Sequence, residues 1–267
     1  MKRILYLASF DISQRTGGGL ASLCYYNALC RIRPGLVDLV LPAECCCGIY
    51  KNAIGLPKRN FIDFLFDFSM HRGRKFIKNF LRQHGREYDI CVINDSRYGG
   101  DLMDMIHNYD IKIVMIHHNY EVEYCMSNKT WQTLHGIIPY WVSYIEKKAY
   151  RDADANCYLT RDDIKLITNA YGESHGKAHL LGVFDYMDLE YRPANSGILT
   201  TAIITGSLND YQTYHSIQIF EKDYYPIVQR LYPHMNLIIA GRNPDNVILQ
   251  FETRYKGNIK VRKQWMM

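Results

Sequence analysis

The chain has 267 residues, of which 48% are hydrophobic and 22% are charged, and its formal net charge is +5. This composition is typical of a folded globular protein and excludes a disordered chain. The charge permits attraction to phosphate-bearing ligands or to anionic lipid. It is too small to indicate a nucleic-acid-binding protein, so we expect no nucleic acid among the partners.

The N-terminal segment and the cysteines indicate a reduced compartment. The first apolar run is short and ends at Asp11, which fits a buried strand better than a secretory signal. No apolar run approaches the roughly 20 residues that a membrane span needs. The eight cysteines include no Cys-x-x-Cys pair, and three of them are adjacent at 45–47. We therefore expect a cytoplasmic protein.

Strands alternate with helices through the first two thirds of the chain. Apolar runs predict strands at 4–8, 36–41, 90–93, 111–116 and 155–159. Helices are predicted from the glycines at 17–19 to Pro34, from about 100 to 108, and over 138–149. In the last of these, Glu146 shares the polar side with Lys147 and Lys148. A capping box of Thr160 and Asp163 begins a further helix, which Gly172 ends.

The pattern lapses into Asp, Asn, Pro and Gly around 182–197 and then starts again. The second part has predicted strands at 200–205, 237–240 and 258–261 and a short predicted helix at 247–255. A helical stripe, kinked at Pro226, is formed by Ile217, Phe220, Tyr224, Val228 and Leu231. We expect an α/β protein of two Rossmann-like, doubly wound domains, the second incomplete. Residues 1–182 form the first domain, 183–198 the linker and 199–267 the partial second domain.

The glycines at 17–19 follow a predicted strand and open a helix. Backbone N–H groups and the helix dipole receive anions at such a point. The dinucleotide fingerprint is incomplete, because Ser22 stands where its third glycine is expected. A turn that needs positive φ explains the glycines equally well.

The sequence His117-His118-Asn119-Tyr120-Glu121 directly follows the predicted strand 111–116. Ligands of open α/β sheets bind at the carboxyl ends of strands, which favours a cleft position for these residues over a purely structural one. An imidazole there can hydrogen-bond a sugar hydroxyl or a phosphate, or act as a general base. We expect no metal, because adjacent histidines point to opposite sides and no third ligand has diagnostic spacing.

Asp95 lies just after another predicted strand, in Asn94-Asp95-Ser96-Arg97. Its position fits a cleft residue and fits a helix N-cap at least as well.

Residues 58–86 combine basic and aromatic side chains. The basic residues are Lys58, Arg59, Arg72, Arg74, Lys75, Lys78, Arg82 and Arg86, and the phenylalanines are Phe61, Phe64, Phe66, Phe68, Phe76 and Phe80. This pattern suits an interfacial helix on anionic lipid. It also suits an amphipathic helix with its phenylalanines in the core and its basic face in solvent.

Taken in order, these segments resemble the family 4 glycosyltransferases of GT-B fold. The resemblance rests on the glycine loop, on the His-Asn-x-Glu sequence and on the stretch from Glu146 through Asp154 to Thr160. It continues with 182–185 and Pro193, with 205–209, with Tyr225-Pro226, and with 237–241 and Pro244. It covers nearly the whole chain.

The resemblance implies that the first domain binds a glycan or lipid-linked acceptor and the second a nucleotide-sugar donor. Transfer would be retaining and metal-independent, with no cofactor beyond the donor. The backbones of Gly18 and Gly19 would approach the sugar or phosphate, and Gly206 and Ser207 would lie near the donor phosphates. His118 would line the reaction centre.

Glu121 would orient the acceptor or the histidine, and we place Asp95, His117 and Asn119 in the acceptor cleft. Polysaccharide biosynthesis is the role that the family makes plausible. The location would be the cytoplasm or the inner face of the membrane.

The sequence departs from the family pattern in its second domain. An Arg and a Lys often hold the donor diphosphate there, whereas this chain has Ser207, Asn209 and Asp210, and the later Glu-x7-Glu element is absent before Met267. We therefore expect either a transferase, truncated in its second domain and active or inactive as it stands, or a non-catalytic binding or scaffold protein. The broken glycine fingerprint disfavours an NAD-dependent oxidoreductase.

Overall fold

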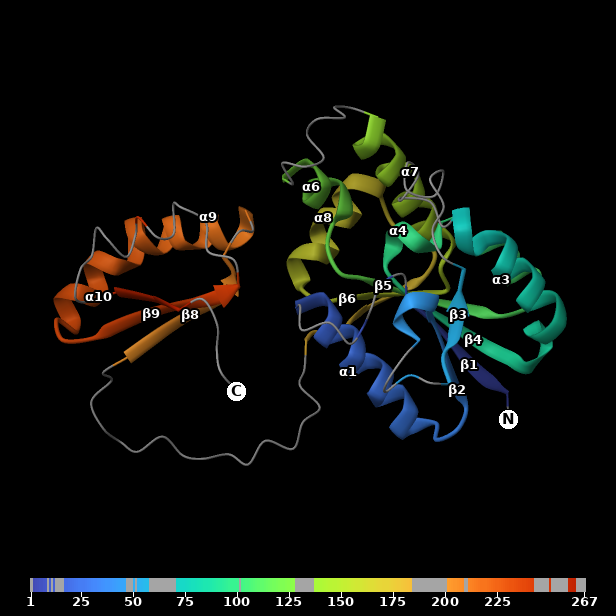
Figure 1. Cartoon of the computed structure of the whole chain (residues 1–267). Coiled ribbons are helices and arrows are strands. Elements are labelled where there is room, and N and C mark those ends of the chain that lie inside the picture. Colours follow the sequence, from blue (N-terminus) through green and yellow to red (C-terminus); the bar gives the residue numbers. More distant parts are fainter. Residues whose placement is uncertain are drawn as a thin grey trace. The chain divides into compact units, whose positions relative to one another are not determined.

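The computed structural model describes residues 2–8, 10, 12, 17–46, 50, 52–57, 71–100, 102–127, 137–183, 201–208, 211–242, 250 and 259–262. The chain divides into two compact units, Met1–Asp188 and Leu189–Met267, each with its own sheet (Figure 1). The division falls inside the segment predicted as the linker. Most of that segment lies outside the described residues, so its exact limits stay a prediction.

The first unit contains a seven-stranded parallel sheet in the order β3-β2-β1-β4-β5-β6-β7. Its strands are β1 (Arg3–Ala8), β2 (Val37–Pro42), β3 (Ile54–Leu56), β4 (Tyr88–Asn94), β5 (Lys112–His117), β6 (Ala155–Tyr158) and β7 (Lys177–Leu180). The strand order reverses between β1 and β4, as in a doubly wound Rossmann-type sheet. This confirms the predicted fold class for the first unit.

Helices cover both faces of this sheet (Figure 1). They are α1 (Gly17–Ile32), α3 (His71–His84), α4 (Ser96–Gly99), α5 (Met103–His107), α6 (Glu121–Ser127), α7 (Ile137–Asp152) and α8 (Arg161–Tyr171), with 3-10 turns at Ala43–Cys45 and Gly85–Glu87. The predicted capping box of Thr160 and Asp163 starts α8, and Gly172 ends it at φ +80°. Both helix-end predictions are confirmed.

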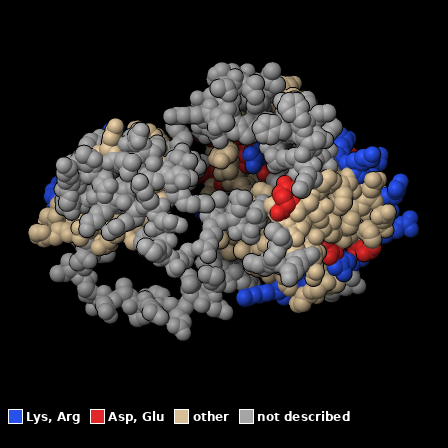
Figure 2. All heavy atoms as spheres, in the orientation of Figure 1, with Lys and Arg blue, Asp and Glu red and all other residues tan. Residues whose placement is uncertain are grey.

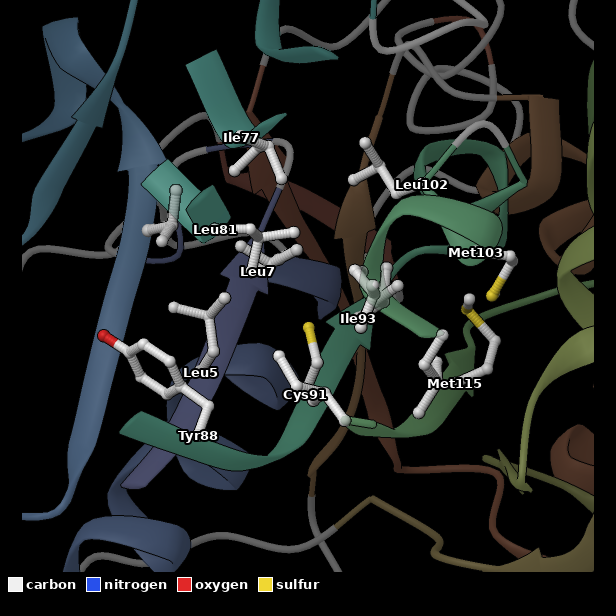
Figure 3. Close-up of a cluster of buried hydrophobic side chains, with 14 of the residues drawn as sticks. Leu5, Leu7, Ile77, Leu81, Tyr88, Cys91, Ile93, Leu102, Met103 and Met115 are labelled. Atoms are coloured by element: carbon white, nitrogen blue, oxygen red, sulfur yellow. The ribbon is translucent and has the colours of Figure 1, made fainter. Parts of the chain in front are cut away.

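The central strands are buried on both faces, because their side chains alternate between two cores. Leu5 and Leu7 of β1 pack with Ile77 and Leu81 of α3 on one face (Figure 3). Tyr6, the residue between them, packs on the other face with residues of α1 and β2. The continuous apolar runs that predicted these strands follow from this two-sided burial.

Helix α4 packs closely on α7 through glycine. A Cβ at Gly100 would lie 2.5 Å from the carbonyl oxygen of Ile145 on α7. The predicted helix over 100–108 is shorter than expected, since only α5 (Met103–His107) is α-helical there, and α4 was not predicted. The close approach of α7 explains why the chain between α4 and α5 needs a residue without a side chain.

Only part of the basic and aromatic segment 58–86 is described, and residues 58–70 lie outside the described residues. In α3, Phe76 and Phe80 pack against the core, while Arg74, Lys75, Lys78, Arg82 and Arg86 on and beyond the helix are exposed. Figure 2 shows basic side chains gathered on the side of the first unit where α3 lies. This is the amphipathic alternative, so the two rings are not free to enter lipid. Membrane binding stays a prediction that rests on the basic face.

No helix in the part of the chain that the structure describes is long and apolar enough to cross a membrane.

The second unit has a three-stranded parallel sheet in the order β10-β9-β8, made of β8 (Thr201–Ser207), β9 (Asn236–Arg242) and β10 (Ile259–Arg262). Helices α9 (Tyr211–Ile219) and α10 (Tyr225–Leu231) are joined by a π-helical turn at Phe220–Tyr224. This order is that of the first half of a Rossmann-type sheet. The predicted helix 247–255 lies almost entirely outside the described residues.

The π-turn corrects the predicted helical stripe. Ile217 is buried as expected, but Tyr224 is 57% exposed and Leu231 is 60% exposed, and Tyr225 is buried instead. A π-turn inserts an extra residue into the helix, so the side that faces the core moves by one position. Pro226 is the second residue of α10, two positions after the turn, and lacks the N–H that a continuous regular helix would need there.

The contact of Gly100 with α7 gives a stability prediction. Gly100→Ala should lower the free energy of unfolding by about 1–3 kcal/mol, because its methyl group must displace the α7 backbone. Gly18→Ala is the matched control, since its methyl group would meet its nearest neighbour at 4.0 Å. Urea unfolding compares the two variants, and equal stability would contradict the packing described here.

Candidate functional site

The carboxyl ends of β1, β4 and β5 bring several predicted site residues together. In the sheet register, Asn94 at the end of β4 lies between Ala8 of β1 and Ile116 of β5. Helix α1 begins after β1, and His118 follows β5. The strand order reverses between β1 and β4, which is where open α/β sheets bind ligands.

A chain of three hydrogen bonds connects these elements. His118 Nε2 lies 2.8 Å from Asn94 Oδ1, Asn94 Nδ2 donates to Ser22 Oγ at 2.6 Å, and Ser22 Oγ donates to the Gly18 carbonyl at 2.6 Å. Asn94 and Ser22 are completely buried, whereas His118 is partly exposed. The buried amide and hydroxyl therefore hold the ring at Nε2, in a residue that is itself partly exposed.

Gly18 lies in the first turn of α1 and is exposed. Among the described glycines, positive φ occurs at Gly35, Gly172 and Gly182, so the positive-φ explanation is wrong for the glycines at 17–19. A Cβ at Gly18 would have His118 Nδ1 as its nearest neighbour, at 4.0 Å. Gly18 therefore places no side chain of its own beside this ring nitrogen.

Burial lowers the pKa of His118 below its usual 6.5, with Asp95 acting to raise it and Arg97 to lower it. The ring is therefore neutral at pH 7, with one nitrogen protonated and the other a hydrogen-bond acceptor. Phe10 packs edge-on against it, with ring centroids 6.0 Å apart. Such a histidine can accept a hydrogen bond or a proton from a hydroxyl group.

The structure places His117 in the core rather than on an accessible surface. Its ring is fully buried and stacks on Tyr158, and its Nε2 lies 2.8 Å from Asn156 Oδ1. Burial lowers the pKa of His117 to about 4. Its described contacts fix the packing of β5 on β6, and the acceptor-cleft position predicted for this residue is a poor fit to them.

Asp95 is the N-cap of α4 and accepts a hydrogen bond from the backbone N–H of Arg97 at 2.9 Å. Its φ of +152° lies in a region that side chains rarely adopt. The Arg97 guanidinium donates to both of its carboxylate oxygens. Burial raises the pKa of Asp95, but the charge and hydrogen bonds of Arg97 together with His118 outweigh it, and the net shift is downward. Asp95 is 3% exposed, so its described role is that of the N-cap.

Glu121 begins α6 and is 1% exposed. Its Oε2 lies 3.2 Å from Arg97 Nε, and a hydrogen bond from the Asn119 side chain lowers its pKa. Burial is the stronger effect and raises the pKa of Glu121 to about 8. Within the described residues, Glu121 contacts this buried group and does not contact His118. No direct contact therefore supports the prediction that Glu121 orients the histidine.

Glu146 of α7 completes the buried group and corrects the predicted polar side of that helix, because it is fully buried. Its Oε1 accepts the backbone N–H of Glu121 at 3.1 Å, and its Oε2 accepts the Tyr171 hydroxyl at 2.9 Å. Burial raises the pKa of Glu146 from 4.5 to about 7. Asp95 and Glu121 thus share the Arg97 guanidinium, and Glu146 connects to them through Ser96 and the Glu121 backbone, so the group joins α4, α6, α7 and α8.

The donor-site residues predicted in the second unit lie at the end of β8. A Cβ at Gly206 would lie 2.6 Å from the Thr213 hydroxyl of α9, so packing alone requires a glycine there. Gly241 of β9 is closer still, since its Cβ would lie 1.8 Å from the Gly206 carbonyl oxygen. Ser207 ends β8, and its side chain lies outside the described part of the structure.

Sequence reasoning missed two residues of the site, Asn94 and Ser22. Asn94 directly follows the apolar run 90–93 of its strand, and a buried amide at a strand end is a recognisable sign of a polar contact. Ser22 was visible only as a departure from the glycine fingerprint. Its hydroxyl is what links Gly18 to Asn94.

Solved glycosyltransferases share this fold. Sucrose-phosphate synthase from Thermosynechococcus elongatus has a TM-score of 0.66 and 14% identity, over 99% of this chain and 71% of that one. HepE of Anabaena, in complex with UDP and glucose, has a TM-score of 0.57 and 13% identity, over 98% and 69%. UGT2 of Phytolacca americana, complexed with UDP-2fluoro-glucose and pterostilbene, has a TM-score of 0.54 and 11% identity, over 99% of this chain and 72% of that one.

No family model matches the sequence, and no curated protein matches it. The likeness to solved structures confirms the predicted GT-B fold class of Rossmann-like α/β units.

The raised pKa of Glu146 gives a pH-dependent stability prediction. The folded state binds a proton that the unfolded state releases near pH 4.5, so stability falls as the pH rises from about 4.5 to 7. Glu146→Gln removes this pH-dependent loss. The free energy of unfolding of the variant, measured relative to that of the native chain, should therefore increase by about 2 kcal/mol from pH 5 to pH 8. Urea unfolding at both values measures the gain.

Glu123→Gln on the exposed side of α6 is the control, and it should show no such trend. A gain from Glu146→Gln that is the same at both pH values would contradict a buried, proton-binding Glu146.

Proposed function

We propose that the chain is a family 4 glycosyltransferase that moves a hexosyl group from a nucleotide-sugar to a glycan or lipid-linked acceptor. One observation carries this proposal. A neutral imidazole, His118, is held at Nε2 and open at Nδ1, where the strand order of a GT-B type unit reverses. The solved HepE and UGT2 complexes, which share the fold, hold UDP or a UDP-sugar analogue, and this supports a nucleotide-sugar donor here.

His118 is assigned the contact with the reacting sugar. Its Nδ1 accepts a hydrogen bond from a sugar hydroxyl beside the first turn of α1, where the backbones of Gly18 and Gly19 approach the sugar or its phosphate. In the second unit, Gly206 and Ser207 lie near the donor phosphates. The transfer is retaining and uses no metal or further cofactor.

The buried carboxylates take a supporting part in this proposal. Glu121 and Asp95 are both nearly inaccessible and share Arg97, so they hold the starts of α6 and α4 at the strand ends. Asn119, which is partly exposed between His118 and α6, is the better candidate to face the acceptor. His117 supports the sheet from within.

The alternative is a binding or scaffold protein that keeps the fold without turnover. Nucleotide-sugar binding without transfer or hydrolysis would favour it, and so would a stable monomer that binds no donor. Isothermal titration with UDP-sugars and the mass from size-exclusion chromatography distinguish these cases.

His118→Ala should lower kcat/KM for transfer at least tenfold, because it removes one hydrogen bond to the reacting sugar. A panel of UDP-sugars, with released UDP as the readout, measures the effect. His84→Ala, which alters an exposed histidine of α3, is the matched control and should leave transfer unchanged. An active chain whose rate is unaffected by His118→Ala would contradict the assigned role.

A position at the inner face of the membrane would bring the chain close to a lipid-linked acceptor. The exposed basic face of α3 supports this location. Lys75→Glu with Lys78→Glu should reduce pelleting with anionic vesicles by tenfold or more, because each basic residue contributes about 1 kcal/mol near the surface. Lys165→Glu on α8 is the control, and equal pelleting of all three proteins would contradict the proposed surface.

A further inference from the structure

The hydrogen-bond chain behind His118 has only one consistent assignment of donors and acceptors. The Gly18 carbonyl can only accept, so the Ser22 hydroxyl uses its single hydrogen there. Ser22 Oγ must then accept from Asn94, and the NH₂ group of that amide faces Ser22. The amide oxygen is left for His118 and can only accept, so the ring carries its hydrogen on Nε2.

We propose that Asn94 and Ser22 are positioning residues that hold His118 in its Nε2–H tautomer and thereby present a bare Nδ1 beside the first turn of α1. Asn94 acts directly on the ring. Ser22 acts one step away, by preventing the amide from turning over. The tautomer itself does not depend on the proposed function, whereas its effect on transfer does.

Geometry gives this tautomer its significance. Among the described residues, Nδ1 is the atom nearest to the position that a Cβ would take at Gly18, and Gly18 is exposed. With the hydrogen on Nε2, the nitrogen at that space is an acceptor. In the other tautomer the same space would meet an N–H donor, and a hydroxyl ligand could not give its hydrogen to the ring.

The amide has a property that a carboxylate at the same position would lack. Asn94 accepts the ring N–H without supplying a negative charge, so it selects the tautomer and favours the imidazolium form much less than a carboxylate would. The charged groups that act on the ring are Asp95 and Arg97 beside α4, and Asp163 from α8, and the adjacent His117 is neutral. Burial outweighs the two carboxylates, and the neutral ring remains the stable form.

The chain contains its own control for this arrangement. His117 makes the same kind of contact with Asn156, whose NH₂ group donates to the Tyr150 carbonyl and to Ser174 Oγ. That pair is fixed independently of Ser22 and Asn94. Changes at Ser22 or Asn94 should therefore alter the ring of His118 and leave the ring of His117 as it is.

The test is ¹⁵N-histidine NMR of the full chain, with signals assigned through His118→Gln and His117→Gln. The unmodified protein should show His118 as the Nε2–H tautomer at neutral pH. Ser22→Ala frees the amide to turn over and should raise the Nδ1–H population several-fold. Asn94→Asp should keep the tautomer and raise the pKa of His118 by about one unit or more, because it adds a charge at the ring.

Activity measurements then connect the tautomer to the proposed transfer. Ser22→Ala should lower kcat/KM about tenfold with little change in the pH profile, and Asn94→Asp should move the acidic limb of that profile to higher pH. If Asn94→Asp does not fold, Ser22→Ala decides alone. The inference is overturned if His118 is the Nδ1–H tautomer in the unmodified protein. It is also overturned if Ser22→Ala leaves the tautomer populations of His118 unchanged. The predicted tautomers without any transfer would instead uphold the inference and contradict the proposed function.

Discussion

The common level at which three parallel strands end is the constraint on which the candidate site depends. Ala8, Asn94 and Ile116 lie side by side across β1, β4 and β5, so the segments that follow these strands leave the sheet at one edge. Residues that are far apart in the chain, such as Gly18 and His118, become neighbours for this reason alone. The hydrophobic alternation that buries the strands on both faces fixes their register, and the register then fixes the site.

The same edge carries two histidine–asparagine pairs with different outcomes. His117 is the last residue of β5 and its ring packs against two tyrosines, whereas His118, one residue later, is a partly exposed residue. Two carboxylates that share Arg97, together with the buried Glu146, connect four helices at the strand ends. A buried group of this kind is costly to form and costly to break by removing one partner. Its position suggests that it specifies the arrangement of those helices.

Much of the first unit was predictable because its strands are apolar throughout and its helices have clear ends. The exceptions have physical reasons. β3 has only three residues, and β7 is exposed along its whole length, so neither has an apolar run that marks a strand. Hydrophobic periodicity predicts Glu146 on the polar side of its helix. The pattern contains no information on the hydroxyl and N–H groups of other elements that hydrogen-bond this side chain in the core. The π-turn shifts the buried stripe of the second unit by one residue, and hydrophobic periodicity cannot predict such a turn.

The sequence predicts where the candidate site lies but not which side chains hydrogen-bond to one another in it. Strand ends followed by glycine or histidine predict the edge of the sheet at which Gly18 and His118 are neighbours. Which of two adjacent histidines is accessible, and that Ser22 has a use, depended on contacts between residues far apart in the sequence.

The pair of glycines at the ends of β8 and β9 affects how variation in this chain should be interpreted. The carbonyl oxygen of Gly206 occupies the space in which any side chain at Gly241 would have to begin, and Thr213 does the same for Gly206. A mutational scan would therefore find both positions intolerant of every replacement. That profile resembles the profile of residues that hold a ligand, yet here crowding of the backbone is enough to produce it. Intolerance at these two glycines is thus no measure of ligand contact.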